Sequence, residues 1–253
     1  MVRDTILFGD CRETLKEFDG KARTCVTSPP YYGLRDYGGE ESQIGQEQTP
    51  EEYIQNLVEV FRSVRDVLTD DGTLWVNIGD SYYNYRPGKG QALPKQTVSK
   101  TKQDLPDKCA KRGNKLEGLK EKDLIGIPWM LAFALRADGW YLRQDIIWHK
   151  PNPMPESVKD RCTKSHEYIF LLSKNRKYYY NNEAIKEPVK QDWGTRDRTK
   201  GKYHNPGTGL VPHSGLSKSY DRKNKRDVWT VTNKPYKGAH FAVYPPDLIE
   251  PCI

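Results

Sequence analysis

The stretch Cys25-Val26-Thr27-Ser28-Pro29-Pro30-Tyr31 decides how this chain is organised. Its first three residues are typical of the end of a buried strand. The two prolines that follow fix φ and cannot donate to a β-ladder, so the strand must stop at Ser28. The result is a stiff, extended turn with an aromatic ring at its tip. A rigid loop or a polyproline ligand would have the same local pattern, so the surrounding sequence has to distinguish them.

Strand and helix patterns alternate along the rest of the chain. Besides the strand ending at Thr27, apolar strands are predicted at Thr5–Phe8, Thr73–Ile78, Trp140–Trp148 and His166–Leu172. Helices are predicted at Arg12–Phe18, at 50–68 behind the N-cap Thr49, from Pro128 to Asp138-Gly139, and from Pro246 onward. Asp70-Asp71-Gly72 is predicted as a turn, and Tyr178–Tyr180 as a strand continuation or hairpin partner.

This alternation predicts an α/β sandwich with a largely parallel sheet. Three strand ends are marked by proline or glycine, at residues 28–31, 79–82 and 149–155. In such a sheet these ends line one rim, which is where α/β proteins bind their ligands.

The net charge of +7 is unevenly distributed along the 253 residues. Residues 86–122 carry 11 basic and 4 acidic side chains, and residues 174–226 carry 14 and 5, whereas residues 1–85 carry 8 and 16. Cations that alternate with aromatic rings suit nucleic acid, because cations meet phosphates and rings stack on bases. Solvated loops are the alternative interpretation of both basic stretches. The rings within the second stretch are Trp193, Tyr203 and Tyr220.

Several function classes have no support in the sequence. The 5 cysteines are scattered without a CxxC motif, and the 5 histidines show no metal spacing, so neither a disulfide framework nor a metal site is expected. There is no Walker loop, HExxH motif or complete GxGxxG motif. No run is long enough to span a membrane and no signal-peptide core is present, so a reducing, cytoplasmic setting is expected.

With these residues in place, the chain resembles the amino-methylating DNA methyltransferases of restriction–modification systems, in their circularly permuted β-class arrangement. The motif Thr27-Ser28-Pro29-Pro30-Tyr31 after the apolar Val26 carries the resemblance. Its serine form is associated most often with cytosine-N4 enzymes, and an aspartate form with adenine-N6 enzymes. The supporting blocks are Gly9-Asp10, Gly72–Ser81, Gly139–Pro155, Glu167–Leu172 and residues 240–245.

The resemblance implies a Rossmann-like sheet that uses S-adenosyl-L-methionine, encoded by a bacterium or a phage. The implied activity is site-specific methylation of cytosine N4 in double-stranded DNA, with adenine N6 as the alternative. The implied organisation is a catalytic core in two parts, 1–85 and 123–180, separated by a basic insertion at 86–122. A target-recognition segment at 181–226 and the start of a cofactor-binding part at 227–253 follow.

The catalytic motif suits the chemistry of an exocyclic amine. Its nitrogen is a poor nucleophile, because the lone pair is delocalised into the ring. Acceptors that hold both amino hydrogens favour a pyramidal nitrogen, and the Ser28 hydroxyl and the Pro29 carbonyl are suited to this, with Pro30 keeping the carbonyl in place. Tyr31 would stack on a base flipped out of the duplex. Direct methyl transfer needs no nucleophilic cysteine.

The resemblance assigns the remaining site residues by position. Cofactor contacts fall on Asp10, Thr27, His240, Phe241 and Ala242. The wall of the base pocket falls on Trp148, Lys150 and Pro151, although Trp148 is equally typical of strand-end core and Lys150 of solvated surface. The residues expected to bind DNA are Lys200, Lys202, Arg222, Lys223, Lys225 and Arg226.

One departure from the family pattern is large. The Phe-x-Gly-x-Gly cofactor loop and the acidic strand end that follow this region in the family are not present. Without their strands the Thr5–Phe8 strand has no neighbour and a central sheet edge is exposed. We therefore expect a fragment or one half of a split enzyme, with a second chain as a possible partner, that binds S-adenosylmethionine weakly or not at all alone. A non-catalytic DNA-binding module is the alternative of another class.

Overall fold

The computed structural model describes residues 6–34, 43–83, 116–189, 221–236, 238 and 243–253. Residue contacts divide the chain into two compact units. The larger unit comprises Met1–Tyr179 and Val228–Ile253, and the smaller comprises Tyr180–Asp227. Much of the predicted basic insertion, residues 86–115, lies outside the described residues.

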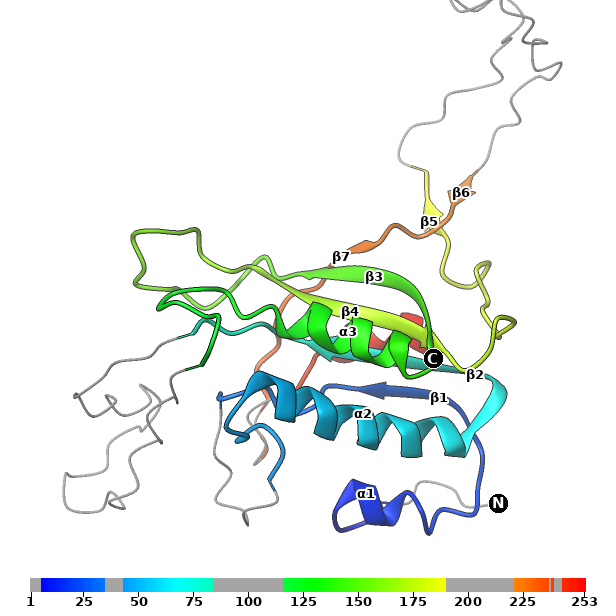
Figure 1. The fold of residues 1–253 in the computed structure, drawn as a ribbon. Coiled ribbons are helices and arrows are strands. Elements are labelled where there is room, and N and C mark those ends of the chain that lie inside the picture. Colours follow the sequence, from blue (N-terminus) through cyan, green and yellow to red (C-terminus); the bar gives the residue numbers. More distant parts are fainter. Residues whose placement is uncertain (1–5, 35–42, 84–115, 190–220, 237, 239–242) are drawn as a thin grey trace, which may run out of the picture. The chain divides into compact units, whose positions relative to one another are not determined.

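A five-stranded sheet forms the centre of the larger unit (Figure 1). In spatial order the strands are β1 (Ala22–Thr27), β2 (Leu68–Ile78), β4 (His166–Ser173), β3 (Tyr141–His149) and β7 (Val228–Thr230). Neighbouring strands are parallel in the β1–β2 and β3–β7 pairs and antiparallel in the β2–β4 and β3–β4 pairs. The predicted α/β class is confirmed, but the sheet is mixed rather than largely parallel.

Two amphipathic helices cover one face of this sheet, α2 (Pro50–Val67) and α3 (Ile127–Ala137), as predicted. Thr49 caps α2 by accepting a hydrogen bond from the Glu52 amide at 3.2 Å, and the Glu52 carboxylate accepts one from the Gln48 amide at 3.1 Å. Helix α3 ends at Ala137 and is followed by the C-cap Asp138 and by Gly139, whose φ of +101° lies in the region that favours glycine. The shorter elements are α1 (Cys11–Thr14), α4 (Pro246–Ile249) and the 3-10 turn η2 (Glu250–Cys252).

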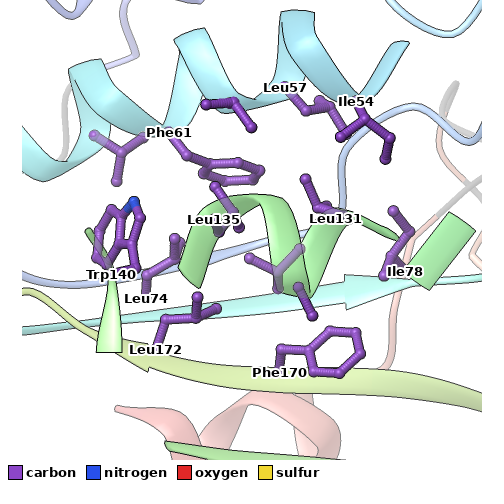
Figure 2. Close-up of a cluster of buried hydrophobic side chains, with 14 of the residues drawn as sticks. Ile54, Leu57, Phe61, Leu74, Ile78, Leu131, Leu135, Trp140, Phe170 and Leu172 are labelled. Atoms are coloured by element: carbon purple, nitrogen blue, oxygen red, sulfur yellow. The ribbon is translucent and has the colours of Figure 1, made fainter. Parts of the chain in front are cut away.

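The alternation of side chains along the strands divides the core into two clusters, one on each face of the sheet. Leu74 and Ile78 of β2 point to the face with α2 and α3, where they meet Phe61 and Leu131 (Figure 2). Trp75, between them in sequence, points to the opposite face and joins Leu248 of α4. The central strands are therefore buried on both sides, which explains their nearly continuous apolar sequence.

The structure corrects the first predicted strand. Residues 6–8 are not a strand, and Ile6, Leu7 and Phe8 are 74%, 50% and 89% exposed. Among the described residues they have no partner strand, so their β-propensity alone does not order them. The helix predicted at Arg12–Phe18 is also shorter, ending at Thr14.

Two other predictions around β2 and β4 are wrong. Asp70-Asp71-Gly72 lies within β2, where the pairing with β1 jumps from Ala22–Leu68 to Thr24–Thr73. These residues form an irregularity inside the strand rather than a turn before it. Tyr178–Tyr180 is not a strand; the Tyr179 amide instead donates to the Asp71 carbonyl at 3.0 Å.

The smaller unit contains a short antiparallel ladder between β5 (Glu187–Pro188) and β6 (Arg222–Lys223). The Arg226 guanidinium pairs with the Glu187 carboxylate at 2.9 Å and lowers its pKa, although desolvation of Glu187 opposes the shift. In the part of the chain that the structure describes, no helix has the length and apolarity needed to cross a membrane.

Candidate active site

The sheet topology brings the predicted rim together. Strands β1 and β2 are parallel, and β3 is parallel to β2 because β4 lies antiparallel between them. The segments 28–31, 79–82 and 149–155 therefore follow the carboxyl ends of three strands at one edge, as predicted. The reversed direction of β4 places its first residues, His166 and Glu167, at that same edge.

The diproline corner is held from two sides. The Tyr53 hydroxyl, on α2, donates to the Pro30 carbonyl at 2.7 Å, and the Ser81 hydroxyl donates to the Tyr32 carbonyl at 3.2 Å. Pro29 is buried and Ser28 is partly buried. Within the described part of the chain, no donor occupies the Pro29 carbonyl, so this oxygen remains available as an acceptor.

The Tyr31 side chain lies partly buried across the rim. Its hydroxyl donates to the Glu167 carboxylate at 2.8 Å and approaches the Asn77 side-chain oxygen at 3.3 Å. A Cβ atom on Gly79 would lie 2.7 Å from the ring, so the ring packs directly on the glycine backbone. Burial raises the pKa of Tyr31 well above its usual value, and the Glu167 charge raises it further, whereas interaction with Ser28 lowers it. Tyr31 is therefore a neutral donor at physiological pH.

The three residues predicted to line a base pocket occupy different environments. Lys150 forms an ion pair with Glu167, in which the side chains are 16% and 17% exposed, and its ammonium lies 4.1 Å from the centroid of the Trp148 ring. Trp148 is only 4% exposed; its indole donates to the Val231 carbonyl at 2.9 Å, and it belongs to the core cluster shared with α4. Pro151 is exposed. Lys150, rather than Trp148, is the residue that reaches the rim.

The predicted cofactor residues are only partly described. Thr27 is partly buried at the end of β1. Asp10 caps α1, accepting from the Arg12 amide at 2.8 Å and from the Arg12 guanidinium at 3.0 Å. These hydrogen bonds lower the pKa of Asp10 to about 2. The residues His240, Phe241 and Ala242 lie outside the described residues.

The predicted DNA-binding cations belong to the smaller unit. Arg222 donates to the Lys186 carbonyl at 2.9 Å, and Arg226 is paired with Glu187 as described above. Lys223 and Lys225 are partly buried. The remaining two, Lys200 and Lys202, lie outside the described residues.

Glu167 and Asn77 are site residues that the motif search did not assign individually. Asn77 lies inside β2, and Glu167 precedes the apolar core of β4. Only the direction of β4 shows that Glu167 reaches the rim. The sequence feature that could have identified Glu167 is its position directly before the apolar run 168–172. Among the described residues, no group of three or more histidine, cysteine, aspartate or glutamate side chains is arranged to hold a metal ion.

Comparison with known proteins identifies the family. The family model N6_N4_Mtase, described as DNA methylase, matches residues 22–253. The chain is 47% identical over 254 residues to the Type II methyltransferase M.SmaI of Serratia marcescens, covering 98% of this chain and 73% of that protein. It is 46% identical over 255 residues to M.XycI of Xanthomonas campestris pv. cyanopsidis, covering 100% of this chain and 73% of that one.

A solved structure agrees in fold. The PvuII DNA methyltransferase, described as cytosine-N4-specific, superposes with a TM-score of 0.51 at 16% identity, covering 96% of this chain and 67% of that chain. The rim and these matches define an amino-methylating DNA methyltransferase of the restriction–modification type. The chain belongs to the N6_N4_Mtase family of DNA methylases, whose methyl donor is S-adenosyl-L-methionine.

Of the described residues expected to contact this donor, Thr27 stands at the end of β1, and the carboxylate of Asp10 is engaged by Arg12. Asp10 can contact the donor only by sharing or exchanging these hydrogen bonds.

Proposed function

We propose that this protein methylates the N4 amine of cytosine in double-stranded DNA. The observation that carries the proposal is the position of Ser28 and Pro29 directly after the end of β1, at the rim where Tyr31 meets Glu167. The serine form of the motif supports cytosine over adenine. The cytosine-N4 specificity in the description of the PvuII enzyme is consistent with this choice.

The chain's own residues act by orientation. The Ser28 oxygen and the Pro29 carbonyl each accept one amino hydrogen of the flipped base, which directs the nitrogen lone pair away from both acceptors. Tyr31 lies beside the base ring, and its contact with Gly79 limits how far the ring can move. The donor, when bound, supplies a methyl group on a sulfonium centre. The amine nitrogen would bond to that methyl carbon as the bond from carbon to the sulfonium sulfur breaks, with the sulfur keeping the electron pair as a neutral thioether. The methylated amine would then lose one proton to solvent, so no covalent enzyme intermediate is needed.

The base assignment is tested by incubating the purified protein, alone and mixed with the part of M.SmaI that lies outside the matched region, with duplex DNA and donor carrying an isotope-labelled methyl group. The DNA is then hydrolysed and its nucleosides are separated by mass spectrometry. We expect label in N4-methyldeoxycytidine, lost in Ser28→Ala and retained in the control Ser63→Ala at a partly buried position on α2. Label in N6-methyldeoxyadenosine would replace the cytosine assignment with the adenine one. Salt-sensitive DNA binding without any transfer would favour a non-catalytic module.

We further propose that the free edge of β1 takes additional strands in the active enzyme. Strand β1 pairs only with β2 among the described strands, and beside it in sequence Ile6, Leu7 and Phe8 are exposed apolar residues without partners. Unpaired edges and exposed apolar segments of this kind are liabilities unless something covers them. M.SmaI is also longer than the region that matches this chain, because the match covers 73% of M.SmaI. The strands come either from sequence outside these 253 residues or from a second chain.

Hydrogen exchange tests this edge directly. The protein is produced alone and together with the part of M.SmaI that lies outside the matched region. We expect the outer amides of β1 to exchange at least about tenfold more slowly in the complex, while those of the central strand β4 stay unchanged as an internal control. Equal exchange of β1 in both samples would contradict the proposal.

A further inference from the structure

Glu167 joins the site residues that come from three other strand ends. Its carboxylate accepts from the Tyr31 hydroxyl at 2.8 Å and from the Asn77 amide at 3.2 Å, and it pairs with the Lys150 ammonium. The side chain is 17% exposed, so these partners replace most of the water around the charge. The two residues expected nearest the target base, Tyr31 and Lys150, are thus bound to one carboxylate.

The direction of the hydrogen bonds follows from the donors and acceptors present. An ionised carboxylate only accepts, so the single Tyr31 proton points to Glu167. The Asn77 amide donates to the same carboxylate oxygen, and the Lys150 ammonium donates to the other one. Glu167 therefore holds donors from three strand ends at once.

We propose that Glu167 is the positioning residue of the methylation site. By accepting from Tyr31 it fixes the aromatic ring beside the base. By pairing with Lys150 it holds this ammonium at the rim, over the Trp148 ring. This inference rests on the proposed function, since it concerns how the same site holds the base amine. Glu167 itself does not touch the reacting atoms.

The conservative variant Glu167→Gln separates charge from shape. A glutamine has one acceptor oxygen, so it can accept from Tyr31 or from Lys150, while its NH₂ group meets the other donor unfavourably. The variant Tyr31→Phe retains the ring and the Lys150–Glu167 pair but removes the hydroxyl. A ring that only stacks on the base would work equally well as phenylalanine, whereas a ring that Glu167 anchors through its hydroxyl would not. Glu59→Gln, at an exposed position on α2, is the matched control.

Two measurements are made on these variants. Fluorine NMR of protein labelled with 3-fluorotyrosine reports the ring environment, and the Tyr31 resonance is assigned by its absence from Tyr31→Phe. Single-turnover transfer of labelled methyl groups to DNA reports the reaction. We expect Glu167→Gln to displace the Tyr31 resonance, and both site variants to slow transfer by about tenfold or more. Binding of S-adenosylmethionine should change by less than about twofold, and Glu59→Gln should match the wild type.

The outcomes distinguish this proposal from the proposed function. An unmoved Tyr31 resonance in Glu167→Gln would refute it, as would full activity of Tyr31→Phe. If Glu167→Gln does not fold, the activity of Tyr31→Phe decides alone. If the wild-type protein transfers no methyl group, the proposed function fails. The resonance still decides whether Glu167 anchors Tyr31.

Discussion

The ring of Tyr31 rests on a position that only glycine can occupy without a shift. In Gly79→Ala the new Cβ would lie 2.7 Å from one ring carbon and 3.2 Å from the next, so the ring must move. We expect the hydrogen bond to Glu167 to break and methyl transfer to fall by about tenfold or more, measured in single turnover. Gly118→Ala is the control, because it meets no atom within 4 Å and bears only the strain of its φ of +82°.

The motif residues of the site could be predicted from the sequence, but their interactions could not. The prolines after Thr27 required a strand end, and the structure has β1 ending there. The position of Glu167 depends on the pairing of β4 with both neighbours, which no local pattern encodes. Trp148 shows the same limit, since its burial in the second core cluster depends on residues far along the chain, such as Val231.

At the scale of elements, the start of α2 depends on one hydroxyl. Thr49 accepts from the Glu52 amide, and this bond satisfies one of the amides left free at the helix start. We expect Thr49→Ala to lower the free energy of unfolding by about 1 kcal/mol, measured by urea denaturation. Thr49→Ser keeps an acceptor and should lose far less. Equal losses in the two variants would show that the methyl group, and not the cap, matters.

The cap of α1 should respond to acid. The pKa of Asp10 falls from 3.8 to about 2 on folding, chiefly through its bond from the Arg12 side chain. A lowered carboxyl pKa stabilises the folded state above the unfolded value, and this contribution is lost as the pH falls from about 4 towards 2. Carboxyl NMR of Asp10 should show its midpoint near the lower value. Asp10→Asn retains an acceptor oxygen but should abolish this pH dependence.

Helix positions were more predictable than strand partners. Periodicity and caps located α2 and α3 within one or two residues, because a helix satisfies its hydrogen bonds locally. The strand predicted before Gly9 failed, because a strand needs a partner that the described residues do not supply. The mixed directions in the sheet were also missed, since alternation of helix and strand suggested parallel crossovers throughout.

At the scale of the whole molecule, the smaller unit should be separable. Residues 181–226 carry 11 basic and 5 acidic side chains, and Tyr180–Asp227 forms its own contact unit. Replacing 181–226 with a Gly-Ser linker should leave a single cooperative unfolding transition, because the core clusters lie in the larger unit. Salt-dependent binding to duplex DNA should weaken strongly, as measured by anisotropy at several salt concentrations. A loss of cooperative unfolding would show that the units depend on each other.

The antiparallel pairing of β3 with β4 has a consequence for how related enzymes can diverge. The ladder places His149 opposite His166, so Lys150 and Glu167 are set by the last rungs of the hairpin and not by the segment between them. Insertions or deletions within residues 152–163 therefore change what the tip of the hairpin can touch while leaving the ion pair where it is. The length of this hairpin can therefore vary without moving the Lys150–Glu167 pair at its base.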